Sequence, residues 1–244
     1  MNYTQEEYDD ILLASQSVHY FAGLCLPEVY KQQKHLLDTY FADEHSLAFV
    51  SRQCGNTTIQ AIYVLWCLIF KNNITIGYTT TNSGLCESFI GRILEINEKL
   101  PEHLKAKFDK LNRYTLLSTS KTRIIAKPMN INAFKGMTLN AIIIDLFHFQ
   151  KKKNFYEFLQ CLYPCLIASQ AKIIMSTNIN PHGFKMYEFI NDFNLNKNFW
   201  ITGIPYNKCS NYSEVLDKRY QLYHNPEFYL AEYCCTDREG IVYA

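Results

Sequence analysis

The sequence predicts an α/β domain built around a mostly parallel sheet, and three observations support this prediction. Short, almost wholly apolar segments alternate with longer segments of helical periodicity, a pattern typical of strands that crossover helices bury on both faces. Hydrophobic residues make up 48% of the chain and charged residues 19%, a balance that excludes disorder. The length of 244 residues is enough for one large core.

The residues that precede the first predicted strand are expected to form helices. Apolar residues recur at helical spacing over residues 3–20 and again over 28–41, so a helix is predicted for each. An apolar strand over 47–50 then leads through a polar loop into a helix over 58–71. The longest apolar stretch, 59–70, falls short of the ~20 residues that span a bilayer, which predicts a core helix and no membrane span.

Strands and helices continue to alternate up to residue 204. The next predicted elements are a strand over 74–78, a helix over 83–100, a helical turn over 101–108 and a hairpin of strands over 114–117 and 123–127. The remaining ones are a strand over 140–145, a helix over 155–169, a strand over 172–175, a helix over 184–193 and a strand over 199–204. This alternation is the basis for expecting parallel strands.

Charge and cysteine content limit the setting. The net charge is +1, from 24 basic and 23 acidic residues, so no global field directs the chain to nucleic acid or membrane. The nine cysteines are an odd number, and the polar, acidic start is unlike a secretion signal. We therefore expect a reduced cytoplasmic setting in which most cysteines act as small buried hydrophobes. Without repeated CxxC spacing, no structural zinc is expected.

The loop after the first predicted strand has the context of a phosphate-binding P-loop. Ligands on parallel sheets bind at the carboxyl ends of strands, where loops enter helix N-termini. Residues 51–58 read SRQCGNTT. Gly55 and Thr57 fit the GxxxxGK[ST] frame, but Asn56 stands where lysine is expected. On this loop alone, an ordinary polar turn between a strand and a helix remains an open alternative.

Two further strand ends add to this pattern. Residues 141–145 read AIIID, a Walker B pattern in which Asp145 would hold Mg²⁺ through water. A helix-capping aspartate is the open alternative. A third apolar strand ends in Ser176, Thr177 and Asn178. The order of P-loop, acidic strand and further strand predicts an additional-strand P-loop ATPase.

Together these segments resemble the ATPase domain of the large terminase subunit of tailed bacteriophages, the motor that packages DNA. Residues 49–66 (FVSRQCGNTTIQAIYVLW) resemble its Walker A region, and residues 132–149 (NAFKGMTLNAIIIDLFHF) resemble the stretch into Walker B. Residues 172–190 (KIIMSTNINPHGFKMYEFI) are similar to the coupling motif, and YKQQKHLL, at 30–37, to the adenine-reading segment. The closing residues 228–244 (FYLAEYCCTDREGIVYA) resemble the junction that leads out of the motor domain.

The resemblance implies a fold and a division of the chain. The implied fold is a RecA-like, additional-strand P-loop NTPase, a three-layer sandwich with a mostly parallel sheet. Residues 1–25 would form an N-terminal helical segment, 26–235 the ATPase domain, and 236–244 a remnant of the junction to an absent nuclease domain.

The resemblance also implies a site for ATP and Mg²⁺. The residues that it places around the nucleotide are Gln33, Ser51, Arg52, Gln53, Cys54, Gly55, Asn56, Thr57 and Thr58. Gln33 would read the adenine, although a solvated helix glutamine is an equally open alternative. Arg52 and Asp145 would act in catalysis, and Thr57 and Asp145 would hold Mg²⁺. Ser176, Thr177 and Asn178 would couple the nucleotide state to movement.

Two departures from the family pattern fall on the residues that do the chemistry. Asn56 replaces the lysine that pairs with the phosphates, and Leu146 replaces the glutamate that activates water. Lys135 is a candidate substitute cation, while His148 could replace the acid only if the strand ended differently. ATP and Mg²⁺ are therefore expected to bind weakly or not at all.

The leading hypothesis is a viral, terminase-like pseudo-ATPase with a structural or regulatory role in DNA packaging. Two alternatives stay open: an active packaging motor that works with a nuclease on another chain, and an interaction module that needs no nucleotide. The partners expected are the portal, the small terminase or a separate nuclease chain, with double-stranded DNA and self-association also open. The expected location is the host cytoplasm or the virion.

Overall fold

A single eight-stranded sheet organises the computed structural model, which describes residues 3–180, 182–223 and 225–236. The strands are β1 (His45–Val50), β2 (Thr75–Thr80), β3 (Phe108–Asn112), β4 (Thr115–Ser118), β5 (Arg123–Pro128), β6 (Ala141–Asp145), β7 (Lys172–Thr177) and β8 (Phe199–Ile204). Their order in the sheet is β3-β4-β5-β2-β6-β7-β1-β8. From β5 to β8 all neighbours pair in parallel, and near one edge β4 runs antiparallel to both of its neighbours, β3 and β5. The mostly parallel sheet predicted from the sequence is confirmed.

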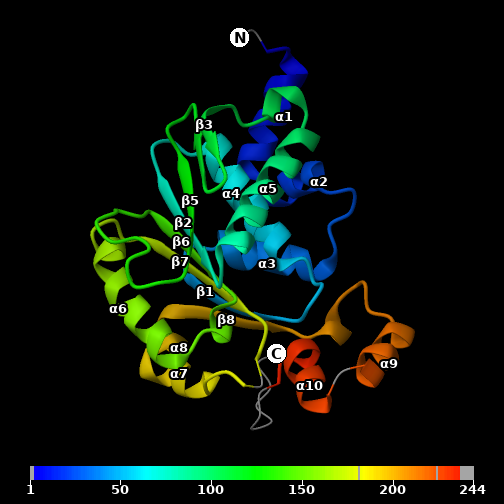
Figure 1. Ribbon diagram of the computed structural model, residues 1–244. Coiled ribbons are helices and arrows are strands. Elements are labelled where there is room, and N and C mark those ends of the chain that lie inside the picture. Colours follow the sequence, from blue (N-terminus) through cyan, green and yellow to red (C-terminus); the bar gives the residue numbers. More distant parts are fainter. Residues whose placement is uncertain (1–2, 181, 224, 237–244) are drawn as a thin grey trace.

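Helices cover both faces of this sheet, as Figure 1 shows, and produce the predicted three layers. One face carries α1 (Gln5–Gln16), α2 (Val18–Cys25), α3 (Lys31–Phe41), α4 (Asn56–Phe70) and α5 (Ser83–Lys99). The other carries α6 (Lys152–Ile167), α7 (Met186–Asp192) and α8 (Leu195–Asn198). The last two helices, α9 (Glu214–Tyr223) and α10 (Pro226–Cys234), lie at the end of the sheet.

The strands divide their side chains between two cores. In β1, Leu47 and Phe49 pack with α6 to α8, while Ala48 and Val50 pack with α1 to α5. This alternation follows from the two-residue period of a strand, and burial on both faces explains why the strand is apolar throughout.

Residues 101–128 depart from the sequence-based expectation. The helical turn predicted for 101–108 is only a short 3₁₀ helix, η1 (Glu102–Leu104), and the chain then enters β3, which was not predicted. Four of the five β3 residues are exposed, so the strand lacks the apolar alternation that reveals a strand in sequence. The hairpin predicted from the following two strands is present as antiparallel β4 and β5.

The predicted N-terminal helix is two helices. Ser17 adopts an extended backbone between α1 and α2, and its hydroxyl accepts a hydrogen bond from the Tyr20 N–H, which begins the second helix. Serine favours such cap positions over helix interiors because its side chain can replace a missing backbone partner. Helices α8, α9 and α10 were also not predicted. Of the predicted junction remnant, residues 237–244 lie outside the described residues.

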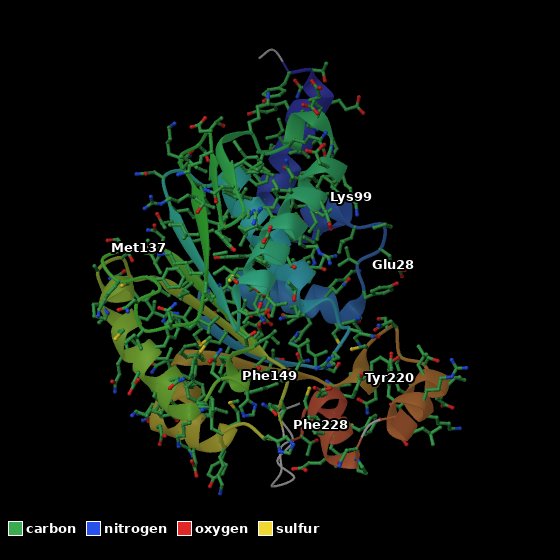
Figure 2. All side chains as sticks on the ribbon, viewed as in Figure 1. Glu28, Lys99, Met137, Phe149, Tyr220 and Phe228 are labelled. Carbon is green, nitrogen blue, oxygen red and sulfur yellow. The ribbon has the colours of Figure 1, made fainter. Side chains whose placement is uncertain are left out.

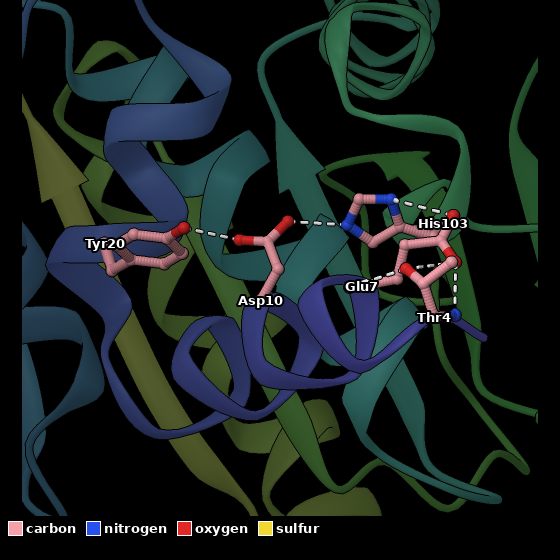
Figure 3. A network of polar contacts seen from close by, with 5 residues as sticks. All are labelled: Thr4, Glu7, Asp10, Tyr20 and His103. Carbon is pink, nitrogen blue, oxygen red and sulfur yellow. Dashed lines mark hydrogen bonds and ion pairs between the residues drawn. The ribbon is translucent and has the colours of Figure 1, made fainter.

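Helix α1 is attached to the rest of the fold by a polar network (Figure 3). Asp10 accepts a hydrogen bond from the hydroxyl of Tyr20 on α2, and its second oxygen lies 2.5 Å from His103 Nε2 on η1. Glu7, one turn earlier, accepts a 2.8 Å hydrogen bond from the Thr4 N–H and lies 4.0 Å from the other His103 ring nitrogen. The carboxylates of α1 thus link this helix to α2 and to η1.

Within the described part of the chain, none of the helices combines the length and apolarity needed to cross a membrane. Nor do the described histidines, cysteines and acidic residues form a group of three or more that could hold a metal ion.

Candidate functional site

The site lies where β6, β7 and β1 end side by side. Because these three neighbouring strands are parallel, the loops that follow them meet at one edge of the sheet. A cleft of about 560 Å³ opens there, a volume typical of ligand sites. All eight residues of the predicted phosphate loop (51–58) line it, as do Asp145, Leu146, Thr177 and Asn178. Phe149, labelled in Figure 2, is another lining residue.

Gly55 shapes the loop where it enters α4. It caps the helix with a left-handed backbone, φ 83°, which favours glycine. A Cβ atom at this position would lie 2.4 Å from Gln33 Nε2, so any other side chain would also have to displace the Gln33 amide. No side chain caps α4, and its first N–H groups therefore remain available to an anion in the cleft.

Gln33 supports this loop from below. Only 8% of the residue is exposed, and its Oε1 accepts a 3.0 Å hydrogen bond from the Tyr30 N–H at the start of α3. Its amide nitrogen faces Gly55. The solvated-glutamine alternative is therefore wrong, whereas an adenine contact remains a prediction.

Asn56, at the lysine position, belongs to a polar network behind the cleft. Its Nδ2 donates a 3.0 Å hydrogen bond to Ser176 Oγ and a longer one, 3.4 Å, to Asp145 Oδ1. Its Oδ1 accepts from the Tyr40 hydroxyl at 2.5 Å. The asparagine amide therefore joins the first residue of α4 to the ends of β6 and β7.

Asp145 is buried among neutral partners. Ser176 Oγ donates to its Oδ1 at 2.6 Å, and the Tyr78 hydroxyl lies 3.3 Å from Oδ2. Ser176 in turn accepts a 2.6 Å hydrogen bond from Gln60 Nε2. Burial raises the pKa of Asp145 to about 6, with the bonds from Ser176 and Tyr78 opposing the rise. At neutral pH the carboxylate is mostly ionised, yet none of these hydrogen-bond partners carries a positive charge.

Leu146, at the position predicted for the catalytic acid, has a left-handed backbone, φ 55°. Its N–H donates to the Ser176 carbonyl at 2.9 Å, and its apolar side chain lines the cleft. Such a backbone is uncommon for a residue with a branched side chain. Leu146 can neither accept a proton from water nor orient it.

His148 does not replace the missing acid. Its Nδ1 accepts a 3.1 Å hydrogen bond from the Asn180 N–H, so its Nε2, 2.6 Å from the Phe184 carbonyl, carries the proton. This tautomer is assigned from the hydrogen-bond pattern. With both ring nitrogens engaged, the histidine links the end of β6 to the segment after β7.

Ser176, Thr177 and Asn178 connect the strands around the cleft. Ser176 bonds to Asp145 on β6, as described above, and Asn178 Nδ2 donates a 2.6 Å hydrogen bond to the Val50 carbonyl of β1. The Thr177 hydroxyl donates to the Asn178 carbonyl at 2.8 Å. A displacement of this segment would therefore disturb hydrogen bonds to both β1 and β6.

Arg52 is bound to α10. Its Nη2 lies 2.7 Å from Glu232 Oε1, and its N–H donates to the Glu232 carbonyl. Among the described residues that line the cleft, Arg52 is the only cation. Lys135, the candidate substitute cation, is exposed, bonds to Asn132 at 3.3 Å and does not line the cleft.

Besides the lining residues Thr81 and Phe149, four residues of the surrounding network escaped the sequence analysis: Tyr40, Gln60, Tyr78 and Glu232. Gln60 could have been suspected from the sequence, because it is an amide within the long apolar run of α4. In the structure it is completely buried. Glu232 could not have been suspected, because only the fold brings α10 to the P-loop. The two tyrosines could not be distinguished in sequence from the 18 tyrosines of the chain.

Comparisons with known proteins agree on the fold. No protein-family model matches the chain. The structure is similar to the large terminase of the thermophilic bacteriophage D6E in complex with ADP, with a TM-score of 0.67 and 15% identity over 88% of this chain, which spans 53% of that protein. The large terminase ATPase domain of Thermus phage P74-26 gives a TM-score of 0.66 at 17% identity, covering 81% of this chain and 90% of that domain.

A more distant likeness reaches beyond phage proteins. A DEAD box protein from Methanococcus jannaschii gives a TM-score of 0.51 at 13% identity, over 85% of this chain and 55% of that protein. Together with β7 lying between the P-loop strand β1 and the acidic strand β6, these similarities confirm the predicted RecA-like, additional-strand architecture. The chain therefore has the fold of the ATPase domain of phage large terminases.

Proposed function

We propose that this protein is a terminase-type pseudo-ATPase, which binds nucleotide weakly at residues 51–58, does not hydrolyse it, and serves a structural or regulatory role in DNA packaging. The proposal rests on the residues found at two positions of the cleft, the one expected to hold the phosphate-pairing cation and the one expected to hold the catalytic acid. Asn56, which is neutral, stands where the phosphate-pairing cation is expected, and Leu146, which is apolar, stands where the acid is expected.

Nucleotide binding is supported by the loop and the cleft. The uncapped N-terminus of α4 offers N–H groups to phosphate, and the cleft of about 560 Å³ has room for a ligand of nucleotide size. The structurally similar D6E terminase was solved with ADP. Weak binding is expected because Arg52, the cleft's one described cation, already pairs with Glu232.

Loss of hydrolysis follows from the chemistry of the two substitutions. General-base catalysis typically contributes ~10²–10⁴ in rate, and one preorganised electrostatic donor on the order of 10²–10³. Losing both leaves little turnover even if the two effects are not additive. His148 is engaged through both ring nitrogens and Lys135 is not part of the cleft lining, which argues against the two substitutes that the sequence offered.

The residues present fit a magnesium ion bound with the nucleotide. Asp145 lines the cleft and, with a pKa of about 6, is mostly ionised at neutral pH. Thr57, exposed in the first turn of α4, supplies the hydroxyl that P-loops direct to Mg²⁺. Bound there, Mg²⁺ would neutralise phosphate charge. Asp145 would hold it through water, since its Oδ1 already accepts from Ser176.

The biological setting is part of the same proposal. The chain spans about half the length of the D6E large terminase. We place its ATPase domain at residues 26–235, with residues 1–25 as a helical attachment and 236–244 leading out of the domain. Its partners would be the portal, the small terminase or a separate nuclease chain, with DNA held by the assembly. The host cytoplasm is the expected location, and incorporation into virions would follow from binding the portal.

Restoring the two missing groups tests this proposal. The double variant Asn56→Lys, Leu146→Glu regains the phosphate cation and the acid, so it is expected to release phosphate from Mg-ATP while the unaltered chain does not. Adding Asp145→Ala should abolish the regained activity, which excludes a contaminating ATPase. Turnover by the unaltered chain that Asp145→Ala removes would refute the proposal. Silence of a double variant that binds ATP would show that these two positions do not account for the loss.

A further inference from the structure

The fold brings Cys54 of the phosphate loop against a second cysteine, Cys209, and the proposed function gives neither thiol a chemical role. Cys54 lies in the loop between β1 and α4, and Cys209 follows η3 (Tyr206–Lys208), after β8. Their sulfur atoms lie 2.7 Å apart, within about 0.7 Å of the covalent S–S length of ~2.05 Å. Their positions in the chain are 155 residues apart, so only the fold pairs them.

We propose that Cys54 and Cys209 form a reversible disulfide in the folded protein when it meets a peroxide. This would be a modification site within the phosphate loop. Because both residues lie in connections rather than inside a helix or strand, the small approach needed does not have to move a regular element.

The surroundings favour Cys54 as the attacking sulfur. The hydrogen bond with Cys209 holds the pKa of the Cys54 thiol below its ordinary value, and the Ser51 hydroxyl at 2.7 Å adds to this, while burial opposes it. The pKa of Cys209 is raised by the same bond and by burial. The thiolate is the nucleophilic form, so Cys54 would react first.

The reaction balances with hydrogen peroxide as the oxidant. The Cys54 thiolate attacks one peroxide oxygen, the O–O bond breaks, and hydroxide leaves to take up a proton, giving a sulfenic acid and water. The Cys209 sulfur then attacks the sulfenic sulfur, the S–O bond breaks, and the thiol proton leaves with the hydroxyl as a second water. Two thiols are oxidised by two electrons and one peroxide is reduced. A small thiol reverses the link by exchange.

The oxidant can reach Cys54, and the other cysteine nearby is less well placed than Cys209 to react with it. Cys54 lines the cleft, so a small oxidant reaches it from solvent although only 1% of the residue is exposed. Cys235, the neighbouring third cysteine, directs its thiol to the Phe49 carbonyl at 3.6 Å, whereas Cys209 lies 2.7 Å from Cys54. Cys235 is therefore a poorer partner for Cys54.

The link would tie the phosphate loop to the segment that leads into α9. Closing a loop of this length removes entropy from the unfolded chain, so the oxidised protein should melt about 5–10 °C higher than the reduced one. Shielding of Cys54 by nucleotide is a further expectation, which rests on the proposed function, since ATP would occupy the same cleft.

The test is peroxide oxidation of the folded, nucleotide-free chain, followed by alkylation, digestion without reductant and mass spectrometry. We expect a peptide pair joined through Cys54 and Cys209, its loss in Cys54→Ser and in Cys209→Ala, and its persistence in the control Cys161→Ser, which alters a partly exposed cysteine of α6. Circular dichroism verifies that each variant is folded. Dithiothreitol should reverse both the link and the rise in melting temperature.

Two results would overturn the disulfide: oxidation of other cysteines in the folded chain without this link, or a link from Cys54 to Cys235 instead. A second arm repeats the oxidation with saturating ATP. Slower linking supports shielding. An unchanged rate, with the link still formed, counts against nucleotide binding in the cleft and leaves the disulfide standing.

Discussion

At the scale of single residues, Asp145 shows how the site is held at a cost to stability. The carboxyl group is buried, and the hydroxyl groups around it supply hydrogen bonds but no positive charge. Keeping it ionised in this setting is unfavourable, which is why its pKa lies at about 6 rather than near the ordinary value of 3.8 for an aspartate. Residues that a binding site needs often reduce stability in this way.

Asp145→Asn is therefore expected to stabilise the protein at pH 7.5, by up to about 3 kcal/mol. The folded-state pKa is raised, so the folded chain holds the proton more tightly than the unfolded chain. Ionisation then costs stability as pH rises from about 4 to about 6, and the variant escapes this cost. Urea denaturation without magnesium should show the gain at pH 7.5 and little at pH 4. An equal gain at both values would contradict the assignment, and the exposed Glu95→Gln serves as the control.

Gly55 should tolerate a methyl group poorly. Gly55→Ala places a side chain on a left-handed backbone and against the Gln33 amide, so we expect a loss of about 1–3 kcal/mol in the free energy of unfolding. Gly91→Ala is the matched control, since it lies in α5 with no atom within 4 Å of the added carbon. It should be neutral or stabilising. Equal effects of the two substitutions, measured by urea denaturation, would show that the loop geometry is not as described.

At the scale of elements, the sequence predicted the strands that carry the site better than the helices around it. The strands β1, β6 and β7 are short apolar runs, because helices bury both of their faces. A wholly apolar run of this kind, which burial on both faces requires, is the clearest structural signal in a sequence. The exposed edge strand β3 and the helices α9 and α10 carry weak apolar patterns, and their positions depend on tertiary contacts.

The attachment of α1 gives a prediction at this scale. Burial, the largest single effect, raises the pKa of Asp10, but the hydrogen bonds with Tyr20 and His103 and the charge of His103 together lower it below its ordinary value. Asp10→Ala should weaken the docking of α1 by about 1–3 kcal/mol. The expected result is that the backbone amides of α1 exchange hydrogen faster in the Asp10→Ala variant than in the unaltered chain.

Asp38→Ala is the control for that prediction, since it removes an aspartate that pairs with the far more exposed His19. It should have an effect of less than about 1 kcal/mol. The Asp10 contribution should be present above its unfolded pKa and be lost as pH falls through its lower folded pKa. Unchanged exchange in α1 after Asp10→Ala would show that the apolar contacts alone dock this helix.

At the scale of the whole molecule, the sequence predicted the architecture and the composition of the cleft, but not the network behind it. Order along the chain was enough to bring residues 51–58, Asp145 and Asn178 to one edge, because parallel strands end together. It could not reveal that Asn56 bonds to Tyr40, or that Glu232 pairs with Arg52. Such contacts join segments far apart in sequence and depend on side-chain placement.

The central claim, binding without hydrolysis, is tested most directly by the fate of bound nucleotide. The purified chain is incubated with radiolabelled ATP and Mg²⁺, and the protein-bound nucleotide is separated and identified by chromatography. The account predicts that the bound label is recovered as ATP, and that unlabelled ATP displaces it at roughly micromolar to millimolar concentration. Recovery of the label as ADP, in amounts that Asp145→Ala abolishes, or no binding at millimolar ATP, would contradict it.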